Sequence, residues 1–393
     1  MPLWLLALLF AALVLYTDDY VIAGLLPEIA ADLGVTEGAA GQLITVFSLT
    51  VAVVAPLGAI ATARWPRRRL LAISVALFIC ANIAAALAPG FFALMAFRIV
   101  AAMAAALATP AIFAATAALA PPERIGRYIA IVALGVTGSI AIGVPLGTWI
   151  GGELGWRWTF AAMALAGGFV LAGVLRTFPG APAPQVLPLG EQVRVLTARP
   201  LVLGFLGNGL AIMGSMMLLS YLAPFLRDLS GTGPDGRGLI FAASGAAGIA
   251  GLWLGGTATD RLGAGRALAL GIGMIVAVMA LFTALWPLRP VASALVVPLA
   301  MVWGGAAFWN SPAIQSWIYG LAGPVAQQAM GLNTSCTYLG VAAGGALGGY
   351  LLDTMGAGAL APVSATLGLM ALLVFRLAGV AQSRVIDQSA GRA

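Results

Sequence analysis

The stretch YTDDY at residues 16–20 constrains how the whole chain folds, because it places two acids inside a long apolar run. The run begins at Leu3 and ends at Pro27, so Asp18 and Asp19 would lie in hydrocarbon if it crosses a bilayer. A charge near a bilayer centre costs about 2.5–3.5 kcal/mol even on lenient insertion scales, so such residues face a water-filled cavity or an opposite charge. The stretch therefore predicts a polar interior enclosed by membrane helices.

One arginine can supply the opposite charge. Arg98 lies in another apolar run, residues 91–119, and is the only arginine far from a predicted membrane edge. If consecutive spans alternate in direction and rise about 1.5 Å per residue, Asp19 and Arg98 lie at similar heights, about 10–12 Å from the outer ends of their spans. A carboxylate that depends on such a partner can take up and release protons. We therefore predict that Asp19 and Arg98 form a proton-coupling site.

Asp18 has several possible roles. Adjacent residues of a helix point about 100° apart, so Asp18 and Asp19 cannot both face the same wall. Asp18 could be a second titrating site, a contact for cationic cargo, the partner of Arg98 itself, or a neutral packed residue.

The composition indicates an integral membrane protein. The 393 residues are 62% hydrophobic and 8% charged, with a mean hydropathy of +1.04, whereas soluble domains average about 25% charged residues. The first apolar run has no basic residue before it and no convincing cleavage site, so we predict a retained span. There is no histidine, and Cys80 and Cys336 lie in apolar runs, so we expect no disulfide, metal site or cofactor.

Apolar runs separated by glycine, proline and charged residues predict about twelve spans. Runs near twenty residues favour helices, because membrane β-strands are about ten residues long and alternate in polarity. The predicted fold class is all-α, with twelve transmembrane helices in two pseudo-symmetric six-helix bundles. The approximate spans are 3–26, 39–62, 70–88, 91–119, 128–151, 158–176, 200–226, 238–258, 267–286, 291–320, 330–352 and 361–380.

The arginines predict the orientation. With the N-terminus in the cytoplasm, fourteen arginines lie on cytoplasmic segments and four on outer ones, a clear positive-inside bias. Both termini are then cytoplasmic, and the net charge of +6 reflects topology rather than a nucleic-acid partner. The outer charged residues are Arg157, Arg227, Arg237 and Arg289 with the acids Glu28, Asp32, Glu37, Glu153, Asp228, Asp235 and Asp353.

The longest polar interruption predicts the domain organisation. Arginine-rich loops recur at corresponding places, 63–69 and 259–266, on either side of it. Two halves with matching loops are typical of a transporter built from parallel repeats. The predicted parts are an N-terminal six-helix bundle at 1–176, a cytoplasmic linker at 177–199, a C-terminal six-helix bundle at 200–380 and a cytoplasmic tail at 381–393.

The stretch GTATDRLGAGR at 256–266 resembles the loop signature of the major facilitator superfamily. Gly256 and Gly263 allow a tight turn and close helix approach, while Asp260, next to Arg261, can cap a helix and pair with a basic residue to latch one gate state. A short loop with an arginine placed by the positive-inside bias is the plain alternative.

The first-half copy, GAIATARWPRRR at 58–69, has Thr62 where the superfamily has Asp, so this half lacks the acid of the latch. Its ending, which includes Arg67 and Arg68, resembles the twelve-span drug:proton antiporters, among them chloramphenicol-resistance and sugar-efflux exporters. The stretch TDDYVIAGLLPEIA at 17–30 is similar to the first-span signature of that subgroup, with Asp19 at the acidic position.

Two later stretches also resemble the superfamily. Arg98 is similar to its fourth-span arginine motif, without the Gln and Gly that usually follow. Gly135, Gly143, Pro145 and Gly147 resemble the fifth-span antiporter motif. We expect the bare glycine face and the proline kink to allow close packing against a helix of the other half, as a hinge or a seal against proton leak. A packing face without functional meaning is the alternative, since the chain has 51 glycines.

The resemblance implies a central cavity lined mainly by the first, fourth, seventh and tenth spans. Aromatic and methionine-rich walls suit an amphipathic cargo, although packing is the commoner role for any one such residue. Asn310 and Asn333 are stronger candidates, because a bare amide in hydrocarbon needs a partner. The candidate substrate-binding residues are Tyr16, Tyr20, Gln42, Phe113, Asn208, Met216, Met217, Tyr221, Trp309, Asn310, Asn333 and Tyr338.

These features together predict proton-coupled efflux of a small amphipathic, chloramphenicol-like compound across a bacterial inner membrane, by alternating access. The partners are the cargo, protons and the lipid bilayer, and nothing requires more than a monomer. Sugar efflux is the first alternative; proton-driven uptake is disfavoured by the fifth-span motif. A membrane enzyme lacks a nucleophile–base arrangement here, and a receptor-like protein would need a sensor domain that the sequence does not contain.

Overall fold

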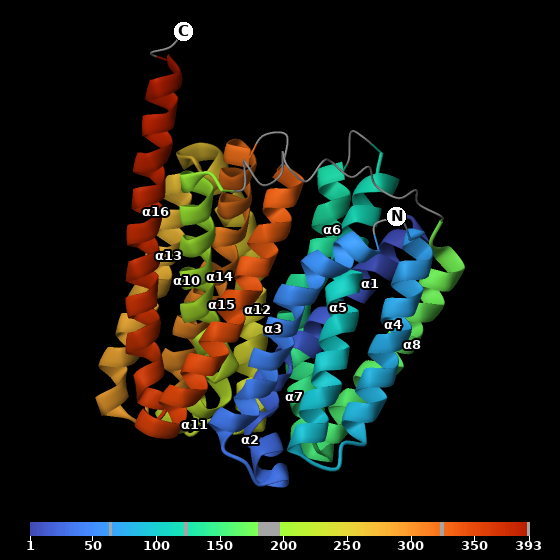
Figure 1. Ribbon diagram of the computed structural model, residues 1–393. Coiled ribbons are helices and arrows are strands. Elements are labelled where there is room, and N and C mark those ends of the chain that lie inside the picture. Colours follow the sequence, from blue (N-terminus) through green and yellow to red (C-terminus); the bar gives the residue numbers. More distant parts are fainter. Residues whose placement is uncertain (63–64, 122–124, 180–196, 323–325, 391–393) are drawn as a thin grey trace.

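The computed structural model describes residues 1–62, 65–121, 125–179, 197–322 and 326–390, and this part of the chain contains helices and no strands. Figure 1 shows the helices from α1 to α8 gathered on one side and those from α10 to α16 on the other. The two termini lie at the same end of the molecule, as an even number of spans requires.

The first group of helices comprises α1 (Leu3–Tyr20), α2 (Ile22–Leu33), α3 (Glu37–Ala61), α4 (Arg67–Ala86), α5 (Phe91–Leu119), α6 (Ile125–Gly138), the π-helix η2 (Ser139–Gly143), α7 (Val144–Leu154) and α8 (Trp156–Thr177). The second comprises α10 (Arg199–Ser220), α11 (Leu222–Ser230), α12 (Pro234–Leu262), α13 (Ala264–Leu285), the 3-10 helix η3 (Trp286–Leu288), α14 (Ser293–Ala322), α15 (Ala326–Met355), the 3-10 helix η5 (Ala357–Ala359) and α16 (Leu360–Ala390).

Each predicted span coincides with one or more of these helices. Eleven helices of the described segments are long and apolar enough to cross a bilayer. The eleventh predicted span falls on α15, whose first turns carry amide and hydroxyl side chains that make it less apolar. The prediction of an all-α membrane fold is confirmed.

The first and seventh spans are interrupted at corresponding points. Val21 separates α1 from α2, and Tyr221 separates α10 from α11. Pro224 follows closely after the second break and has no N–H to donate to the carbonyl of Ser220, so the helix cannot continue unchanged there. The repeated interruption is a feature expected of two related halves.

The fifth span contains a π turn next to its proline. The five residues of η2 end just before Pro145, whose ring and missing N–H exclude the usual α-helical bond to the carbonyl of Ala141. Such π turns are found inside α-helices where the regular ladder is interrupted. The interruption lies where the sequence predicts a kink.

The predicted packing of the fifth-span glycines is wrong. A Cβ on Gly135 would meet the backbone of Leu9 and Leu13, and one on Gly143 would meet the side chain of Thr17. Gly147 faces Val21 in the same way. The bare face therefore packs against the first span, within its own half, because neighbouring helices of one bundle approach most closely where both lack bulk.

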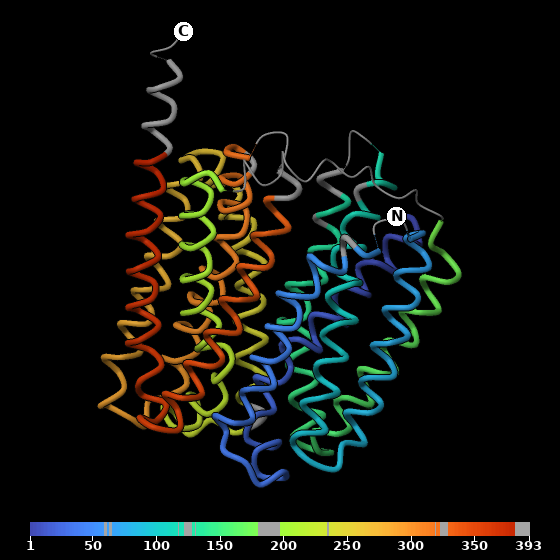
Figure 2. Tube along the Cα trace, viewed as in Figure 1, coloured from blue at the N-terminus to red at the C-terminus, as the bar shows by residue number. Residues whose placement is uncertain are grey.

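Contact with the other half is made through glycines of α12 instead. Gly245 lies against the backbone of Ile140 and Ala141, and Gly238 lies near the backbone of Pro145. The other long contact between the groups runs between α3 and α15, which can be followed as neighbouring tubes in Figure 2.

The predicted linker and the predicted tail lie at the ends of the two halves. Most of the predicted linker, residues 180–196, lies outside the described residues. The predicted tail begins inside α16, which continues as helix to Ala390.

Candidate proton and cargo site

A buried ion pair lies at the centre of the first group of helices. Arg98 of α5 donates to the Asp18 carboxylate, Nη1 to Oδ2, at 2.7 Å, and to the Asp18 backbone carbonyl at 3.0 Å. Both side chains are 0% exposed. The guanidinium also lies over the ring of Phe47, 4.3 Å from its centre. The arginine charge is therefore matched inside a site shielded from water.

The predicted ion pair between Asp19 and Arg98 is wrong in this conformation, because Arg98 binds Asp18. We expect Arg98 to lie at the height of Asp19, and this agrees with the observed Asp18–Arg98 pair because Asp18 is the residue next to Asp19. The direction of the side chain decides between them: consecutive helical residues point about 100° apart, and Asp18 faces α5.

Asp19 makes a different contact. The hydroxyl of Tyr338, on α15 of the other group, donates to Oδ2 of Asp19 at 3.2 Å. Asp19 is only 4% exposed, and in the described part of the chain no cationic group lies within ion-pair distance of it. A buried carboxylate thus meets a neutral donor from the opposite half.

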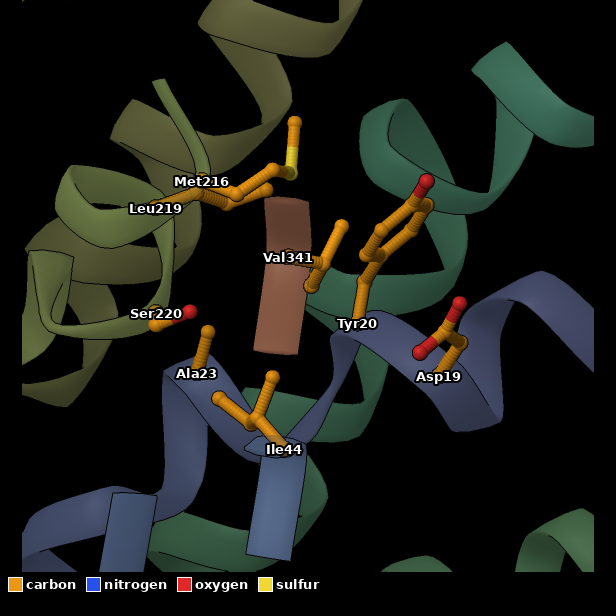
Figure 3. Close-up of a pocket in the computed structure, with 8 residues that line it drawn as sticks. All are labelled: Asp19, Tyr20, Ala23, Ile44, Met216, Leu219, Ser220 and Val341. Carbon is orange, nitrogen blue, oxygen red and sulfur yellow. The ribbon is translucent and has the colours of Figure 1, made fainter. Parts of the chain in front are cut away.

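Two cavities meet at Asp19. The first, which we call the Met216 cavity, is a narrow space between the two groups of helices. In Figure 3 Tyr20 and Asp19 enter from α1 on one side and Met216 and Leu219 from α10 on the other. Its lining residues are Asp19, Tyr20, Ala23, Ile44, Met216, Leu219, Ser220 and Val341.

The second, which we call the Phe47 cavity, is narrower still and reaches toward the end where the termini lie. Its lining residues are Leu15, Tyr16, Asp19, Phe47, Ala105, Thr109 and Tyr338. Neither cavity has room for more than a water-sized molecule, so the helices are closed around the site in this conformation. Among the predicted cargo residues, Tyr16, Tyr20, Met216 and Tyr338 line these cavities.

Four other predicted cargo residues line neither cavity and serve packing. Tyr221 is fully buried and donates to the carbonyl of Gly345 at 2.7 Å. Met217 is fully buried in the same core, and Phe113 packs in the core of the first group. Gln42 donates to Gly38 of its own helix at 3.3 Å. The prediction of cavity contact fails for these residues, because side-chain direction cannot be deduced from polarity or size alone.

The predicted amides also lie outside the two cavities. Asn208 of α10 donates to Asn333 Oδ1 and to Thr337 Oγ1 of α15, each at 3.0 Å. Asn310 donates to Ala306 of its own helix at 3.1 Å. Trp309 donates to the carbonyl of Ala267 at 2.9 Å. Each amide bonds to a protein group, as expected in hydrocarbon, although no described residue donates to the buried Oδ1 of Asn310.

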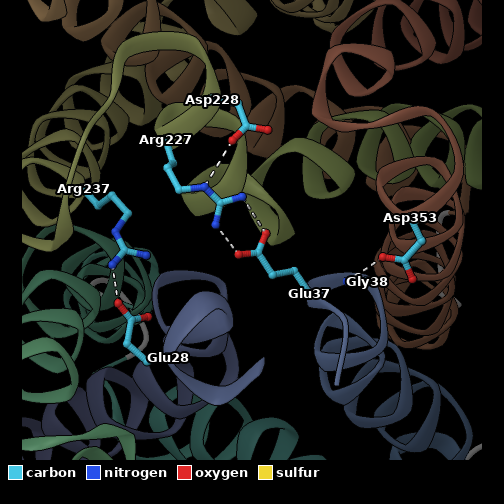
Figure 4. A network of polar contacts seen from close by, with 7 residues as sticks. All are labelled: Glu28, Glu37, Gly38, Arg227, Asp228, Arg237 and Asp353. Atoms are coloured by element: carbon cyan, nitrogen blue, oxygen red, sulfur yellow. Dashed lines mark hydrogen bonds and ion pairs between the residues drawn. The ribbon is translucent and has the colours of Figure 1, made fainter. Parts of the chain in front are cut away.

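Ion pairs join the two groups at the end where α2 and α11 lie (Figure 4). Arg237 pairs with Glu28, and Arg227 pairs with Glu37. Asp353 accepts hydrogen bonds from Thr36 Oγ1 at 2.8 Å and from the N–H of Gly38 at 3.2 Å. These contacts hold the groups together at one end.

These pairs are not among the contacts expected from the sequence. The available signal was that opposite charges share the predicted outer edge, but their choice of partner depends on how the halves dock. One further pair, Asp32 with Arg157, lies within the first group, where the hydrogen bonds from Arg157 and Trp156 hold the pKa of Asp32 below its usual value.

The loop motif residues lie at the opposite end. Asp260 and Arg261 are exposed, and neither makes an ion pair with any residue that the structure describes. Gly263 ends α12 with a φ of 81°, which its missing Cβ allows, while Gly256 lies near Pro312.

In the first-half loop, Arg68 donates to the carbonyl of Leu175, and Arg67 begins α4. Within the described segments, no residue forms with Asp260 the ion pair that the predicted latch needs.

A comparison of the whole sequence with known protein families agrees with the loop motif, the paired halves and the buried arginine. The family profile described as Major Facilitator Superfamily matches residues 8–344. The chain belongs to the major facilitator superfamily. It is therefore a multi-pass membrane transporter and not an enzyme, and the family prediction is confirmed.

Members of this superfamily resemble it along most of the chain. An uncharacterized MFS-type transporter, YbcL of Bacillus subtilis (strain 168), is 30% identical over 361 residues, covering 92% of this chain and 91% of the relative. A chloramphenicol resistance protein of Streptomyces lividans is 35% identical over 265 residues, covering 66% and 67%. The crystal structure of a D-xylose–proton symporter has the same fold, with a TM-score of 0.77 at 18% identity over 94% of this chain and 96% of that one.

Proposed function

We propose that this transporter exports a small amphipathic compound in exchange for protons, across a bacterial inner membrane with both termini in the cytoplasm. The observation that carries the proposal is the position of Asp19. It is a buried carboxylate without a cationic partner among the described residues, and it lines both cavities between the halves. The neighbouring Asp18–Arg98 pair is already neutral, so Asp19 is the group available to bind a proton.

The proposed cycle is a rocking of two halves, residues 1–176 and 200–380, about this site. With the cargo exit open, Asp19 takes a proton from outside. With the cytoplasmic side open, it loses that proton and cargo binds. In the present conformation the ion pairs close the end that the arginine distribution assigns to the outside, as the second state requires, while the helices are still closed around the two cavities.

The hydrogen bond from Tyr338 to Asp19 also agrees with the state in which Asp19 has lost its proton. A donor bound to an ionised carboxylate holds it more strongly than a donor bound to a protonated acid. Loss of the proton from Asp19 therefore strengthens its contact with α15 of the other half. Protonation weakens that contact and makes separation of the halves at this level easier.

Export of an amphipathic compound is supported by the chain's similarity to a chloramphenicol resistance protein and by the cavity walls. The residues that line the two cavities include four aromatic rings and one methionine, and no asparagine or glutamine. The rings and aliphatic side chains suit the apolar part of an amphipathic compound, and the hydroxyls of Ser220 and Thr109 suit its polar part.

The test is gradient-driven transport of chloramphenicol in proteoliposomes, with Asp19→Asn, Asp18→Asn and the unmodified chain compared. We expect Asp19→Asn to abolish accumulation driven by a pH gradient and to keep exchange of cargo for cargo. Glu153→Gln, at an exposed acid far from the cavities, is the matched control and keeps both activities. Accumulation by Asp19→Asn at the unmodified rate would show that coupling does not depend on Asp19.

A further inference from the structure

A carboxylate joins the ends of α3 and α15 on the side that the arginine distribution assigns to the outside. Asp353, in the last turn of α15, accepts a hydrogen bond from the hydroxyl of Thr36 at 2.8 Å and one from the N–H of Gly38 at 3.2 Å. Figure 4 shows this carboxylate beside Gly38 at the start of α3, which belongs to the other half. Each of its two oxygens therefore has a partner across the boundary between the halves.

We propose that Asp353 is an outer latch of the transporter. Its carboxylate binds the start of α3 while the outer ends of the two halves are together, and the contact breaks when they separate. Loss of the latch shifts the protein toward the state that is open to the outside. The inference rests on the rocking of the halves under the proposed function, and it depends neither on the cargo nor on the group that carries the proton.

The start of α3 is a favourable place for a negative charge. The first N–H groups of a helix have no partner within that helix, and together they carry a partial positive charge. The hydroxyl of Thr36 accepts from the N–H of Ala39 at 3.0 Å, so Thr36 caps one of these groups from its own half. Asp353 binds the N–H of Gly38 and the hydroxyl hydrogen of Thr36. The cap of α3 is thus completed by a residue of the other half.

Glycines let the two helices approach closely enough for this contact. A Cβ on Gly38 would collide with the carboxylate of Asp353. One turn further in, a Cβ on Gly349 would lie 2.8 Å from the carbonyl oxygen of Gly38, and a Cβ on Gly345 would lie 2.7 Å from the hydroxyl oxygen of Thr45. The latch therefore lies at the outer end of a closely packed seam. A separation of about 1 Å is enough to break both of its hydrogen bonds.

Asp353 differs from the ion pairs at the same end. Arg227 binds Glu37 of the other half, but it also binds Asp228, the next residue of its own helix. Arg227 therefore keeps a carboxylate partner when the halves separate. Asp353 has no cation within ion-pair distance in the part of the chain that the structure describes. Its protein partners are the groups at the start of α3, and only the closed outer end supplies them.

The experiment measures the distance between two spin labels on the outer ends of the halves, by pulsed electron paramagnetic resonance in lipid nanodiscs. The labels are attached to cysteines introduced by Ala31→Cys and Ala292→Cys at exposed positions of the full-length chain. The native cysteines are removed by Cys80→Ser and Cys336→Ser. The ratio of the long-distance to the short-distance population reports how often the outer end is open, and thermal unfolding confirms that each sample is folded.

We expect Asp353→Ala to raise this ratio about fivefold, which is the effect of removing one helix cap of ordinary strength. Gly38→Ala should raise it as much, because its methyl group displaces the same carboxylate. The double variant should show no larger change than either single one, since both substitutions remove one contact. The controls are Glu153→Gln, at an exposed acid, and Gly90→Ala, where a Cβ meets no atom within 4 Å. Both should keep the ratio of the unmodified chain.

Three outcomes would overturn the inference. An unchanged ratio in Asp353→Ala would show that the carboxylate is no latch, while the rocking of the halves stands. If the effects of Asp353→Ala and Gly38→Ala multiply in the double variant, the two residues act through separate contacts. A single distance population in the unmodified chain and in every variant would contradict the rocking of the halves itself, and the latch with it.

Discussion

The two halves pair their buried polar side chains in different ways. In the first half a fully buried arginine and aspartate pair with each other beside a second aspartate. In the second half Asn208, Asn333 and Thr337 form a neutral hydrogen-bonded cluster between α10 and α15. A neutral cluster satisfies its polar atoms without changing charge. The charged cluster can change its net charge by one proton, and it is the one that meets the cavities.

The comparison predicts unequal costs for breaking each cluster. Removing one partner of a buried ion pair leaves an uncompensated charge and destabilises a protein by about 3–5 kcal/mol. Leaving a neutral buried group without its partner costs about 1–3 kcal/mol.

The largest effect is expected for Arg98→Gln, which leaves Asp18 fully buried without its cation. We expect a loss of about 3–5 kcal/mol of stability, a strong fall in folded protein and loss of transport. The measurement is thermal unfolding of the purified protein. The double variant Arg98→Gln with Asp18→Asn should recover part of the loss, because no charge is then unpaired, and Arg376→Gln, at an exposed residue, is the control. Normal unfolding of Arg98→Gln would contradict the assigned pairing.

The contact between the halves gives the next prediction. Gly245→Val places a side chain against the backbone of Ile140 and Ala141, so we expect about 1–3 kcal/mol of destabilisation and reduced transport. Gly273→Val is the control, since no atom lies within 4 Å of a Cβ there. Equal transport rates for the two variants would show that this contact does not limit the rocking of the halves.

The neutral cluster should tolerate change better than the charged one. Asn208→Leu leaves Asn333 and Thr337 without their donor and is expected to cost about 1–3 kcal/mol. The pH dependence of transport in proteoliposomes should keep its midpoint, because no group near Asp19 changes. A shifted midpoint would mean that the second half takes part in proton binding.

The smallest effect is expected at the exposed pair of Asp32 and Arg157, whose side chains are 46% and 39% exposed. Exposed pairs contribute about 0.2–1 kcal/mol. Arg157 lowers the pKa of Asp32, so this contribution is present above the unfolded-state pKa, about 3.9, and is lost as pH falls through the folded-state pKa. Melting of Asp32→Asn should match that of the unmodified chain in acid and fall below it at neutral pH, with Glu153→Gln unchanged throughout. A gap that persists in acid would point to packing rather than charge.

The candidate site divides into a part that the sequence predicted and a part that it did not. Asp18, Asp19 and Arg98 stood out because charges are rare in apolar runs and each must find a partner. Tyr16, Tyr20, Met216 and Tyr338 were predicted at the cavity together with residues that only pack, such as Tyr221 and Trp309. Residue type indicates what a side chain could bind, whereas helix rotation decides which face it lines.

Hydrophobic length and local motifs are properties of short segments, so the sequence alone was enough to predict an all-helical membrane fold and the family. The folded structure was needed to show that Arg98 binds Asp18, that the fifth-span glycines face α1, and that Tyr338 donates to Asp19. The hydrogen bond of Arg98 joins residues 80 positions apart, and that of Tyr338 joins residues 319 positions apart. Both therefore depend on how whole helices rotate and pack. A change of about 100° in rotation, one residue along a helix, exchanges Asp18 for Asp19.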